Sequence, residues 1–238
     1  MFISDLHLEE DRPDIAEIFI KFMQKEAVKA QALYILGDLF EAWIGDDDLT
    51  LFNQKMINTL KQATSSGLPI YLTHGNRDFL LGKTFLKATG CQLLKDEEVI
   101  LINQIPTLLL HGDTLCTEDI NYLKFRKKAR SFWFKKLVLL KSLKKRREMA
   151  RQYREKSKMH TSTTPDYIMD VTQSAVINVM KKHTVQHLIH GHTHREAIHS
   201  FSLNQQDATR TVLGAWHSEG SALICKENGK KELIHISS

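Results

Sequence analysis

Side chains that can bind a metal ion follow short apolar runs at five places in this sequence. The run at residues 33–36, Leu-Tyr-Ile-Leu, is typical of a buried strand and is followed by Gly37 and Asp38. Asp, His or Asn follow the other four runs in the same way, at residues 5–7, 74–78, 111–113 and 190–194. Ligands of α/β proteins collect at the carboxyl ends of strands, so the repeated pattern predicts a metal centre built from strand ends.

Seven of these side chains form the candidate ligand set. They are two carboxylates, one amide and four imidazoles: Asp5, His7, Asp38, Asn76, His111, His192 and His194. This set is too large for one tetrahedral ion and suits two ions that share a bridging ligand. Nitrogen and oxygen donors without a thiolate favour Mn²⁺, Fe or Zn²⁺ over Ca²⁺ or Mg²⁺.

The charge of such a centre indicates its substrate. Two divalent ions outweigh the charge of the two carboxylates, Asp5 and Asp38, so the site would attract an anion such as a phosphate ester or diphosphate. A pair of ions also activates a bridging water and stabilises the leaving oxygen. The residues themselves therefore predict metal-assisted hydrolysis of a phosphorus ester. A lone histidine is more often structural than a ligand, so His74 receives no role, and His190 is considered only as a support for a ligand.

Hydrophobic periodicity predicts the elements that position these residues. Apolar residues at helical spacing predict a helix over residues 13–29, so the order is β-α-β and the first two strands should be parallel. Further helices are expected at about 49–64 and 83–90, and a hairpin at 99–110. C-terminal strands are expected near residues 210–213, 222–225 and 232–236.

Three consecutive acids, Asp46, Asp47 and Asp48, follow the strand at residues 33–36. They could bind metal, but the favoured interpretation is a solvated loop in which Asp48 caps the next helix. They are therefore kept out of the ligand set.

Composition places the chain among ordinary globular proteins. It has 238 residues, 42% hydrophobic and 26% charged, enough for one large domain with a substantial core. Cys91, Cys116 and Cys225 show no C-x-x-C spacing, which argues against disulfides and a structural zinc site and favours a reducing compartment. No run of 18 apolar residues exists, and the chain opens on a strand motif, so neither a membrane span nor a signal peptide is expected.

Positive charge is concentrated in one segment. Residues 124–158 hold 16 Lys and Arg against two acids, a net charge of +14, whereas the whole chain carries +5. The segment is expected to form one or two helices, followed by a polar linker at residues 161–165 and a helix at about 166–182. Its apolar residues, at 132–134 and 137–140, suit a helix at a membrane interface. The alternative, slightly favoured on these residues alone, is that the apolar side packs on the core.

Five blocks of the sequence resemble the calcineurin-like metallophosphoesterases. In chain order they are Asp5-x-His7, Gly37-Asp38, Gly75-Asn76, His111-Gly112-Asp113 and Gly191-His192-Thr193-His194. Within this superfamily, the amino-acid sequence at residues 34–47, 74–82, 111–116 and 213–217 resembles the UDP-2,3-diacylglucosamine diphosphatases of lipid A biosynthesis. That second resemblance runs nearly from end to end.

The resemblance implies a fold and a metal centre. The fold would be an αββα sandwich, a single domain over residues 1–238 with a helical cap inserted at about 120–165. The cofactor would be two Mn²⁺ ions per chain, bridged by Asp38. One ion would be held by Asp5, His7, Asp38 and His194, and the other by Asp38, Asn76, His111 and His192.

The resemblance also implies a reaction and a location. Water would attack the α-phosphorus of UDP-2,3-diacylglucosamine and release UMP and 2,3-diacylglucosamine 1-phosphate. Substrate contacts would come from Asn76, Arg77, Asp119, Ser157 and His192. The cap would take the acyl chains and meet the anionic surface of the inner membrane. The enzyme would be cytoplasmic and peripheral on that membrane in a Gram-negative bacterium, with no nucleic-acid or protein partner.

Arg77 bears on the type of leaving group. Many relatives in the wider superfamily place a His after Gly-Asn, and a His can protonate a poor alkoxide leaving group. A guanidinium does not usefully give up a proton, but it can hold a phosphate that leaves as a stable anion. Arg77 is therefore expected to stabilise the leaving phosphate and to mark a diphosphate substrate.

Two features depart from the family pattern. Thr161 and Thr164 stand where the family usually offers Asn and Lys contacts to the substrate, so acyl preference or affinity could differ. The first strand has only residues 1–4 before Asp5, so it is either short or begins upstream of this sequence.

Two other functions compete with this assignment. A phosphodiesterase or nuclease of the same fold would use the basic segment on nucleic acid, and salt-dependent DNA binding would reveal it. The apolar residues of that segment favour lipid instead. A scaffold that has lost catalysis is disfavoured because all seven candidate ligands are present.

Overall fold

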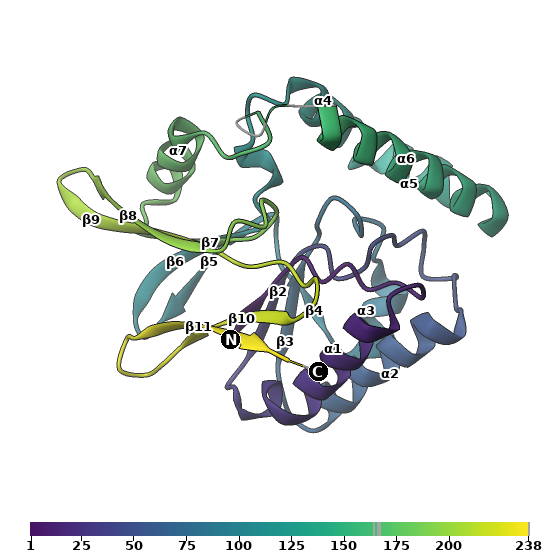
Figure 1. Ribbon diagram of the computed structural model, residues 1–238, viewed down its shortest axis with the longest axis horizontal. Helices are drawn as coiled ribbons and strands as arrows, with labels where there is room; N and C mark the ends of the chain where they lie inside the picture. The colour runs from purple at the N-terminus through teal and green to yellow at the C-terminus, as the bar shows by residue number, and fades with distance from the viewer. Residues whose placement is uncertain (164, 166–167, 238) are drawn as a thin grey trace.

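The computed structural model describes residues 1–163, 165 and 168–237, and the strands of these residues form two sheets (Figure 1). The first has the order β11-β10-β1-β2-β3-β4 and the second β5-β6-β7-β9-β8. The first sheet consists of β1 (Phe2–Ile3), β2 (Leu33–Leu36), β3 (Ile70–Thr73), β4 (Gln92–Leu93), β10 (Gly220–Cys225) and β11 (Lys231–Ile236). The second consists of β5 (Glu97–Ile102), β6 (Ile105–Leu110), β7 (His187–His190), β8 (Ala197–Leu203) and β9 (Gln206–Val212).

Helices cover the outer face of each sheet, and this confirms the expected αββα sandwich. The helices α1 (Pro13–Lys25), α2 (Leu51–Ser65) and α3 (Lys83–Thr89) pack on the first sheet, and α7 (Gln173–His183) packs on the second (Figure 1). A third buried cluster lies between the sheets, where Phe2 and Leu36 meet Leu109 and Ile189. The three clusters correspond to the three interfaces of a four-layer structure.

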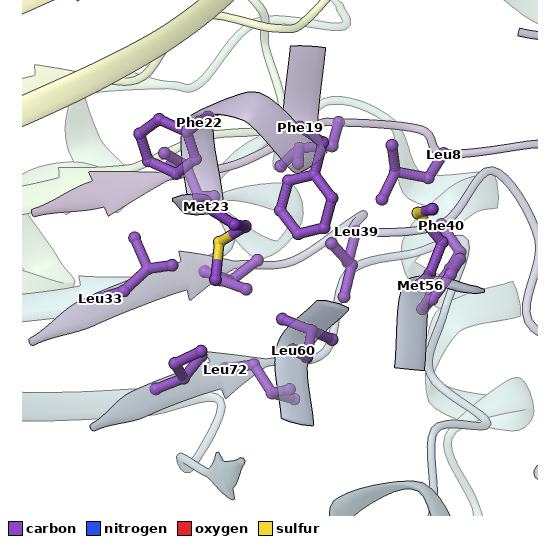
Figure 2. Close-up of a cluster of buried hydrophobic side chains, with 14 of the residues drawn as sticks. Leu8, Phe19, Phe22, Met23, Leu33, Leu39, Phe40, Met56, Leu60 and Leu72 are labelled. Atoms are coloured by element: carbon purple, nitrogen blue, oxygen red, sulfur yellow. The ribbon is translucent and has the colours of Figure 1, made fainter. Parts of the chain in front are cut away.

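The amphipathic face of α1 helps to build the first of these clusters. Figure 2 shows Phe19, Phe22 and Met23 on the side of the helix that faces Leu33 and Leu39. All five side chains are at most 2% exposed. The helical spacing of apolar residues therefore identified this element correctly, although the helix ends at Lys25 and a short 3₁₀ turn follows at Ala27–Lys29.

Strand pairing agrees with the expected order. The strands β1, β2 and β3 are parallel neighbours, as the β-α-β pattern predicted. The hairpin of β5 and β6 is also present, with Asn103 and Gln104 at its turn in left-handed conformation. These pairings place the ends of β1, β2 and β3 at one edge of the first sheet.

Three further helices carry the basic segment: α4 (Ile120–Ala129), α5 (Phe132–Leu139) and α6 (Leu143–Thr163). They lie together on one side of the molecule, at the top of Figure 1. One or two helices were expected, and the extra break precedes α5, where Ser131 accepts a hydrogen bond from the backbone N–H of Phe134. A serine in this position satisfies a helix N-terminus and favours a new start.

Two boundaries of this region were predicted wrongly. The helix α6 continues to Thr163, into the expected linker at residues 161–165, because once a strong helix-forming run has nucleated, each further residue adds a hydrogen bond. The next helix begins at Gln173 and not near residue 166, since the side chain of Thr172 caps it by accepting from the backbone N–H of Ala175. Residues 166–167 lie outside the described residues.

Candidate metal centre

The ends of five strands bring the seven candidate ligands together. The first sheet supplies four of them, after β1, β2 and β3: Asp5, His7, Asp38 and Asn76. The second sheet supplies three, after β6 and β7: His111, His192 and His194. Residues that lie far apart in the sequence thus converge because the two sheets pack with these strand ends on the same side.

Five of the seven candidates have a left-handed backbone conformation. The φ angles are 55°, 50°, 51°, 69° and 58° at Asp5, His7, Asp38, His192 and His194. Such angles are uncommon outside glycine, and they cluster at functional sites where the surrounding structure enforces them. Backbone strain thus marks the same residues that the sequence pattern selected.

Asp38 lies at the centre of the group. Its Oδ2 is 3.9 Å from Nε2 of His7 and 3.8 Å from Nε2 of His111. The Nε2 of His7 is also 3.4 Å from Nε2 of His194, and that of His111 is 3.0 Å from Oδ1 of Asn76. One carboxylate oxygen therefore faces two separate sets of ligand atoms.

Asp5 and His192 complete these two sets. The Oδ1 of Asp5 lies 3.5 Å from Nε2 of His194, and the rings of His192 and His111 are 5.0 Å apart. Asp5 is fully buried, yet its Oδ1 has no hydrogen-bond partner among the described residues. A buried, unsatisfied carboxylate oxygen among imidazole nitrogens is what a divalent cation with mixed ligands requires, so the residues fit a metal centre.

The local electrostatics also favour a cation. Burial would raise the pKa of Asp5, but His194 and the neighbouring histidines hold it well below its usual range. Burial would likewise lower the pKa of His7, but Glu41 and the nearby Asp38 raise it to about 9. The shift of His7 shows a field that stabilises positive charge at its ring, and the shift of Asp5 keeps its carboxylate ionised and able to bind a cation.

Asp78, which was not among the candidates, links two of the ligand loops. Its buried carboxylate accepts hydrogen bonds from the backbone N–H groups of Leu39 and Gly75, both at 2.8 Å. Burial, with Asp38 beside it, raises the pKa of Asp78 to about 6. Asp78 therefore holds the loop after β2 against the loop after β3.

Asp113 and two arginines attach α4 to the same loops. Buried Asp113 accepts from Nε of Arg126 at 2.6 Å and from the hydroxyl of Tyr122 at 2.5 Å. Arg130 donates to the carbonyl oxygen of Gly75 at 2.9 Å. The loop that carries Asn76 is therefore held from above by α4.

A cavity of about 250 Å³ opens over the ligand cluster, and all five expected substrate contacts line it: Asn76, Arg77, Asp119, Ser157 and His192. Arg77 donates to Oγ of Ser157 at 3.4 Å, whereas its Nε and second terminal nitrogen have no hydrogen-bond partner among the described residues. Asp119 also caps α4 by accepting from the backbone N–H of Tyr122. Arg77 thus presents donors that an anion could occupy.

A second cavity, of about 160 Å³, lies between α4–α6 and the loops after β2 and β3. Its walls are mainly apolar and aromatic: Trp43, Phe79, Leu80, Phe125, Phe134, Val138, Met149 and Tyr153. Asn76, Arg77 and Tyr153 line both cavities, so the apolar space adjoins the polar one.

The acids after β2 form the expected solvated loop only in part, since Asp47 is 59% exposed but Asp48 is buried. Asp47 pairs with Arg146 and Asp48 with Arg147, and both arginines belong to α6. The N-cap of α2 is Thr50, so the expectation that Asp48 caps this helix was wrong. Local sequence gives no signal for an ion pair between segments so far apart.

The expected departures from the family pattern at Thr161 and Thr164 cannot be placed in the structure. Thr164 lies outside the described residues, as does the side chain of Thr161.

Residues 1–196 match the family model described as calcineurin-like phosphoesterase. The chain belongs to this family. Two relatives of this phosphoesterase, from Escherichia coli O7:K1 and Escherichia fergusonii, are named UDP-2,3-diacylglucosamine hydrolase. Each is 50% identical over 236 residues, which cover 99% of this chain and 98% of the relative. A solved structure of an archaeal phosphodiesterase matches this chain with a TM-score of 0.51 and 14% sequence identity. The match covers 99% of this chain and 98% of that chain, and at this identity it shows the fold alone.

Family membership makes this phosphoesterase an enzyme, a hydrolase of the metallophosphoesterase class. The family implies divalent metals, and the candidate residues for binding them are present. A non-catalytic scaffold is therefore not supported. No helix in the described part of the chain is long and apolar enough to cross a membrane.

Buried His74 is expected to make the stability of the phosphoesterase pH-dependent. Burial lowers the pKa of His74 to about 4, and its Nε2 lies 2.8 Å from the carbonyl oxygen of Leu81. An unfolded histidine has a pKa of about 6.5 and so binds the proton more readily than the folded one. The free energy of unfolding should therefore fall by about 2–3 kcal/mol between pH 6.5 and pH 4 through this group, and stay level above pH 7.

Urea denaturation at pH 7.5 and pH 4.5 measures this effect. The His74→Gln variant should lose less free energy of unfolding between the two pH values than the unmodified protein. Equal losses in the two proteins would show that His74 does not contribute.

Proposed function

We propose that this enzyme hydrolyses the diphosphate of UDP-2,3-diacylglucosamine to UMP and 2,3-diacylglucosamine 1-phosphate. The observation that carries the proposal is the 50% identity, over 99% of the chain, to relatives named UDP-2,3-diacylglucosamine hydrolase. The adjoining cavities support it, because the substrate likewise joins a charged diphosphate to apolar acyl chains.

The proposed metal ligands form two sets that share Asp38. One Mn²⁺ ion would be held by Asp5, His7, Asp38 and His194, and the other by Asp38, Asn76, His111 and His192. The distances of 3.9 and 3.8 Å from one oxygen of Asp38 to His7 and His111 support a bridging role. Bound there, two divalent ions would supply an activated water and neutralise phosphate oxygens.

The side chains of the larger cavity would bind and orient the substrate. Attack of water on the α-phosphorus breaks its bond to the bridging oxygen, so the sugar phosphate departs as an anion and the new oxygen stays in UMP. Arg77 would bind the departing phosphate through its Nε and terminal N–H groups that make no hydrogen bond among the described residues, and it need not protonate the phosphate. Asn76, Asp119, Ser157 and His192 line the same cavity and would contact the diphosphate and the glucosamine.

We propose that α4–α6 form a cap inserted at about residues 120–165 into a single domain that spans residues 1–238. The contacts of Arg126 with Asp113 and of Arg146 with Asp47 support this arrangement, because they attach α4 and the start of α6 to the loops that follow β6 and β2. The apolar cavity beneath the cap would hold acyl chains.

We also propose that the enzyme binds to the cytoplasmic face of the inner membrane of a Gram-negative bacterium. The exposed side of α5 supports this location. Phe134 and Val138 face the apolar cavity, so the packing interpretation holds for one side of this helix. Trp133 is 69% exposed and Leu140 74%, and Phe132 is exposed beside them. Lysines flank these side chains in the sequence, and aromatic, aliphatic and cationic groups together suit an anionic lipid surface.

The double variant Trp133→Ser, Leu140→Ser is expected to bind anionic phospholipid vesicles at least about tenfold more weakly, because each large side chain withdrawn from lipid costs on the order of 1.5–3 kcal/mol. Co-sedimentation with phosphatidylglycerol vesicles measures this affinity. Leu51→Ser is the matched control, since Leu51 is 85% exposed on α2 and distant in sequence from the cap. Equal vesicle binding by the double variant and by Leu51→Ser would contradict the proposal that α5 binds the membrane.

The function itself is tested by product analysis. Purified protein is incubated with UDP-2,3-diacylglucosamine in detergent, with Mn²⁺ or with EDTA. UMP and the lipid 1-phosphate should form only with Mn²⁺. Hydrolysis of bis(p-nitrophenyl) phosphate alone would leave the metal centre in place and refute the lipid substrate, and nucleic acid would be the next substrate to examine.

A further inference from the structure

We infer that Glu41 is a positioning residue that orients two groups of the proposed centre at once, the metal ligand His7 and the phosphate-binding Arg77. The inference rests on the proposed function of these two residues. One carboxylate oxygen of Glu41 lies 2.8 Å from Nδ1 of His7, and the other lies 3.7 Å from a terminal nitrogen of Arg77. Glu41 itself is not a candidate ligand and does not line the larger cavity.

The backbone holds Glu41 in this place. Leu8 and Phe40 form an isolated parallel bridge, and the N–H of Glu41 donates to the carbonyl oxygen of Leu8 at 3.1 Å. The N–H of His7 in turn donates to the carbonyl oxygen of Asp38 at 3.0 Å. These bonds extend the pairing of β1 and β2 beyond the strands, so Glu41 and His7 are set side by side.

The two ring nitrogens of His7 have different surroundings. Its Nε2 faces Asp38 and His194, at 3.9 and 3.4 Å, so this nitrogen is the one available to an ion. Its Nδ1 faces Glu41. A carboxylate that accepts the Nδ1 hydrogen leaves Nε2 unprotonated, fixes the ring orientation and strengthens the metal–nitrogen bond.

The same carboxylate also restrains Arg77, which the cap contacts through a different residue. Arg77 donates to Ser157 of α6, while Glu41 approaches it from the loop after β2. The guanidinium is thus held between two elements, with donors left for an anion. The nearby Glu9 does not share this task, because its carboxylate accepts from Arg154 at 2.8 Å.

The test measures Mn²⁺ affinity directly, by titration calorimetry or by the electron paramagnetic resonance signal of free Mn²⁺. Glu41→Ala should weaken Mn²⁺ binding about 10- to 100-fold, the usual range for the partner of a ligand histidine. Glu41→Gln should lose less, because its amide oxygen can still accept from Nδ1. Glu10→Ala, an exposed acid of the neighbouring loop, and Arg77→Ala should bind Mn²⁺ like the unmodified protein.

A kinetic cycle tests the second contact. If Glu41 positions Arg77, the double variant should lose less kcat/KM than the product of the fold losses of Glu41→Ala and Arg77→Ala. Unchanged Mn²⁺ affinity in Glu41→Ala, or fully multiplicative losses, would overturn the inference. Absence of Mn²⁺ binding by the unmodified protein would instead refute the proposed metal centre.

Discussion

The Asp38→Ala variant is expected to lose at least about a thousandfold in kcat on UDP-2,3-diacylglucosamine. Asp38 is 2% exposed, and one of its oxygens faces both proposed ligand sets. Its other oxygen accepts from the backbone N–H of Arg77 at 2.8 Å, so the carboxylate also holds the loop that binds the phosphate. Removing it should therefore disturb both ions and the substrate contact together.

Steady-state kinetics and the Mn²⁺ content of the purified variant measure this loss. The variant should hold less Mn²⁺ per chain than the unmodified protein, and thermal melting confirms that it is folded. Asp11→Ala removes an exposed acid from the loop before α1 and should behave like the unmodified protein. An Asp38→Ala variant with near-normal kcat and full metal content would exclude a bridging role.

Arg77→Ala is expected to lower kcat/KM on UDP-2,3-diacylglucosamine about 100- to 1,000-fold and to change hydrolysis of bis(p-nitrophenyl) phosphate by less than about threefold. The difference arises because the diphosphate substrate releases a phosphate that a guanidinium can hold, whereas the ester releases a nitrophenolate. The kcat/KM of Arg77→Lys on the diphosphate should lie between those of the unmodified protein and of Arg77→Ala, since an ammonium keeps the charge and loses the paired donors.

Parallel assays on the two substrates give this comparison directly. Arg151→Ala is a suitable control, because Arg151 is an exposed arginine of α6 that does not line either cavity. An Arg77→Ala variant that retains full activity on the diphosphate, or that loses equally on both substrates, would contradict the assignment of Arg77 to the leaving phosphate.

The candidate ligands could be selected from sequence because each one closely follows an apolar strand. Strand ends are readable locally, and parallel strands must place them at one edge of a sheet, so Asp38 and Asn76 could be expected to meet. The roles of these residues stay predictions, which metal analysis and mutagenesis would test.

The groups that support the ligands could not be selected in the same way. Asp78 accepts a hydrogen bond from the loop of Asp38, and Asp113 accepts one from α4. The carboxylate of Glu41 lies close to His7 and Arg77. Each partner lies in another segment of the chain, and no periodicity or local spacing signals such a contact. The best available sequence signal for a supporting acid is an Asp or Glu close to a ligand motif. The sequence alone does not distinguish such an acid from an exposed acid of a loop.

Boundaries of the fold were missed for local reasons. The hairpin of β8 and β9 was expected only as a strand near residues 210–213, because polar residues occur throughout both strands. Its turn uses Asn204 and Gln205 at φ values of 53° and 62°, where a glycine would have given a stronger signal. On α5, Trp133 and Phe134 are adjacent in sequence and yet face different surroundings. The packing interpretation is therefore correct for one side of this helix, and the membrane interpretation stays a prediction for the other.

Hydrolysis in ¹⁸O-labelled water, followed by mass spectrometry of both products, tests the central claim most directly. The protein with Mn²⁺ and UDP-2,3-diacylglucosamine should release UMP that carries one ¹⁸O and a lipid 1-phosphate that carries none. Label in the lipid phosphate would show attack at the other phosphorus and contradict the assigned roles of the water and of Arg77. Absence of UMP under these conditions would contradict the substrate itself.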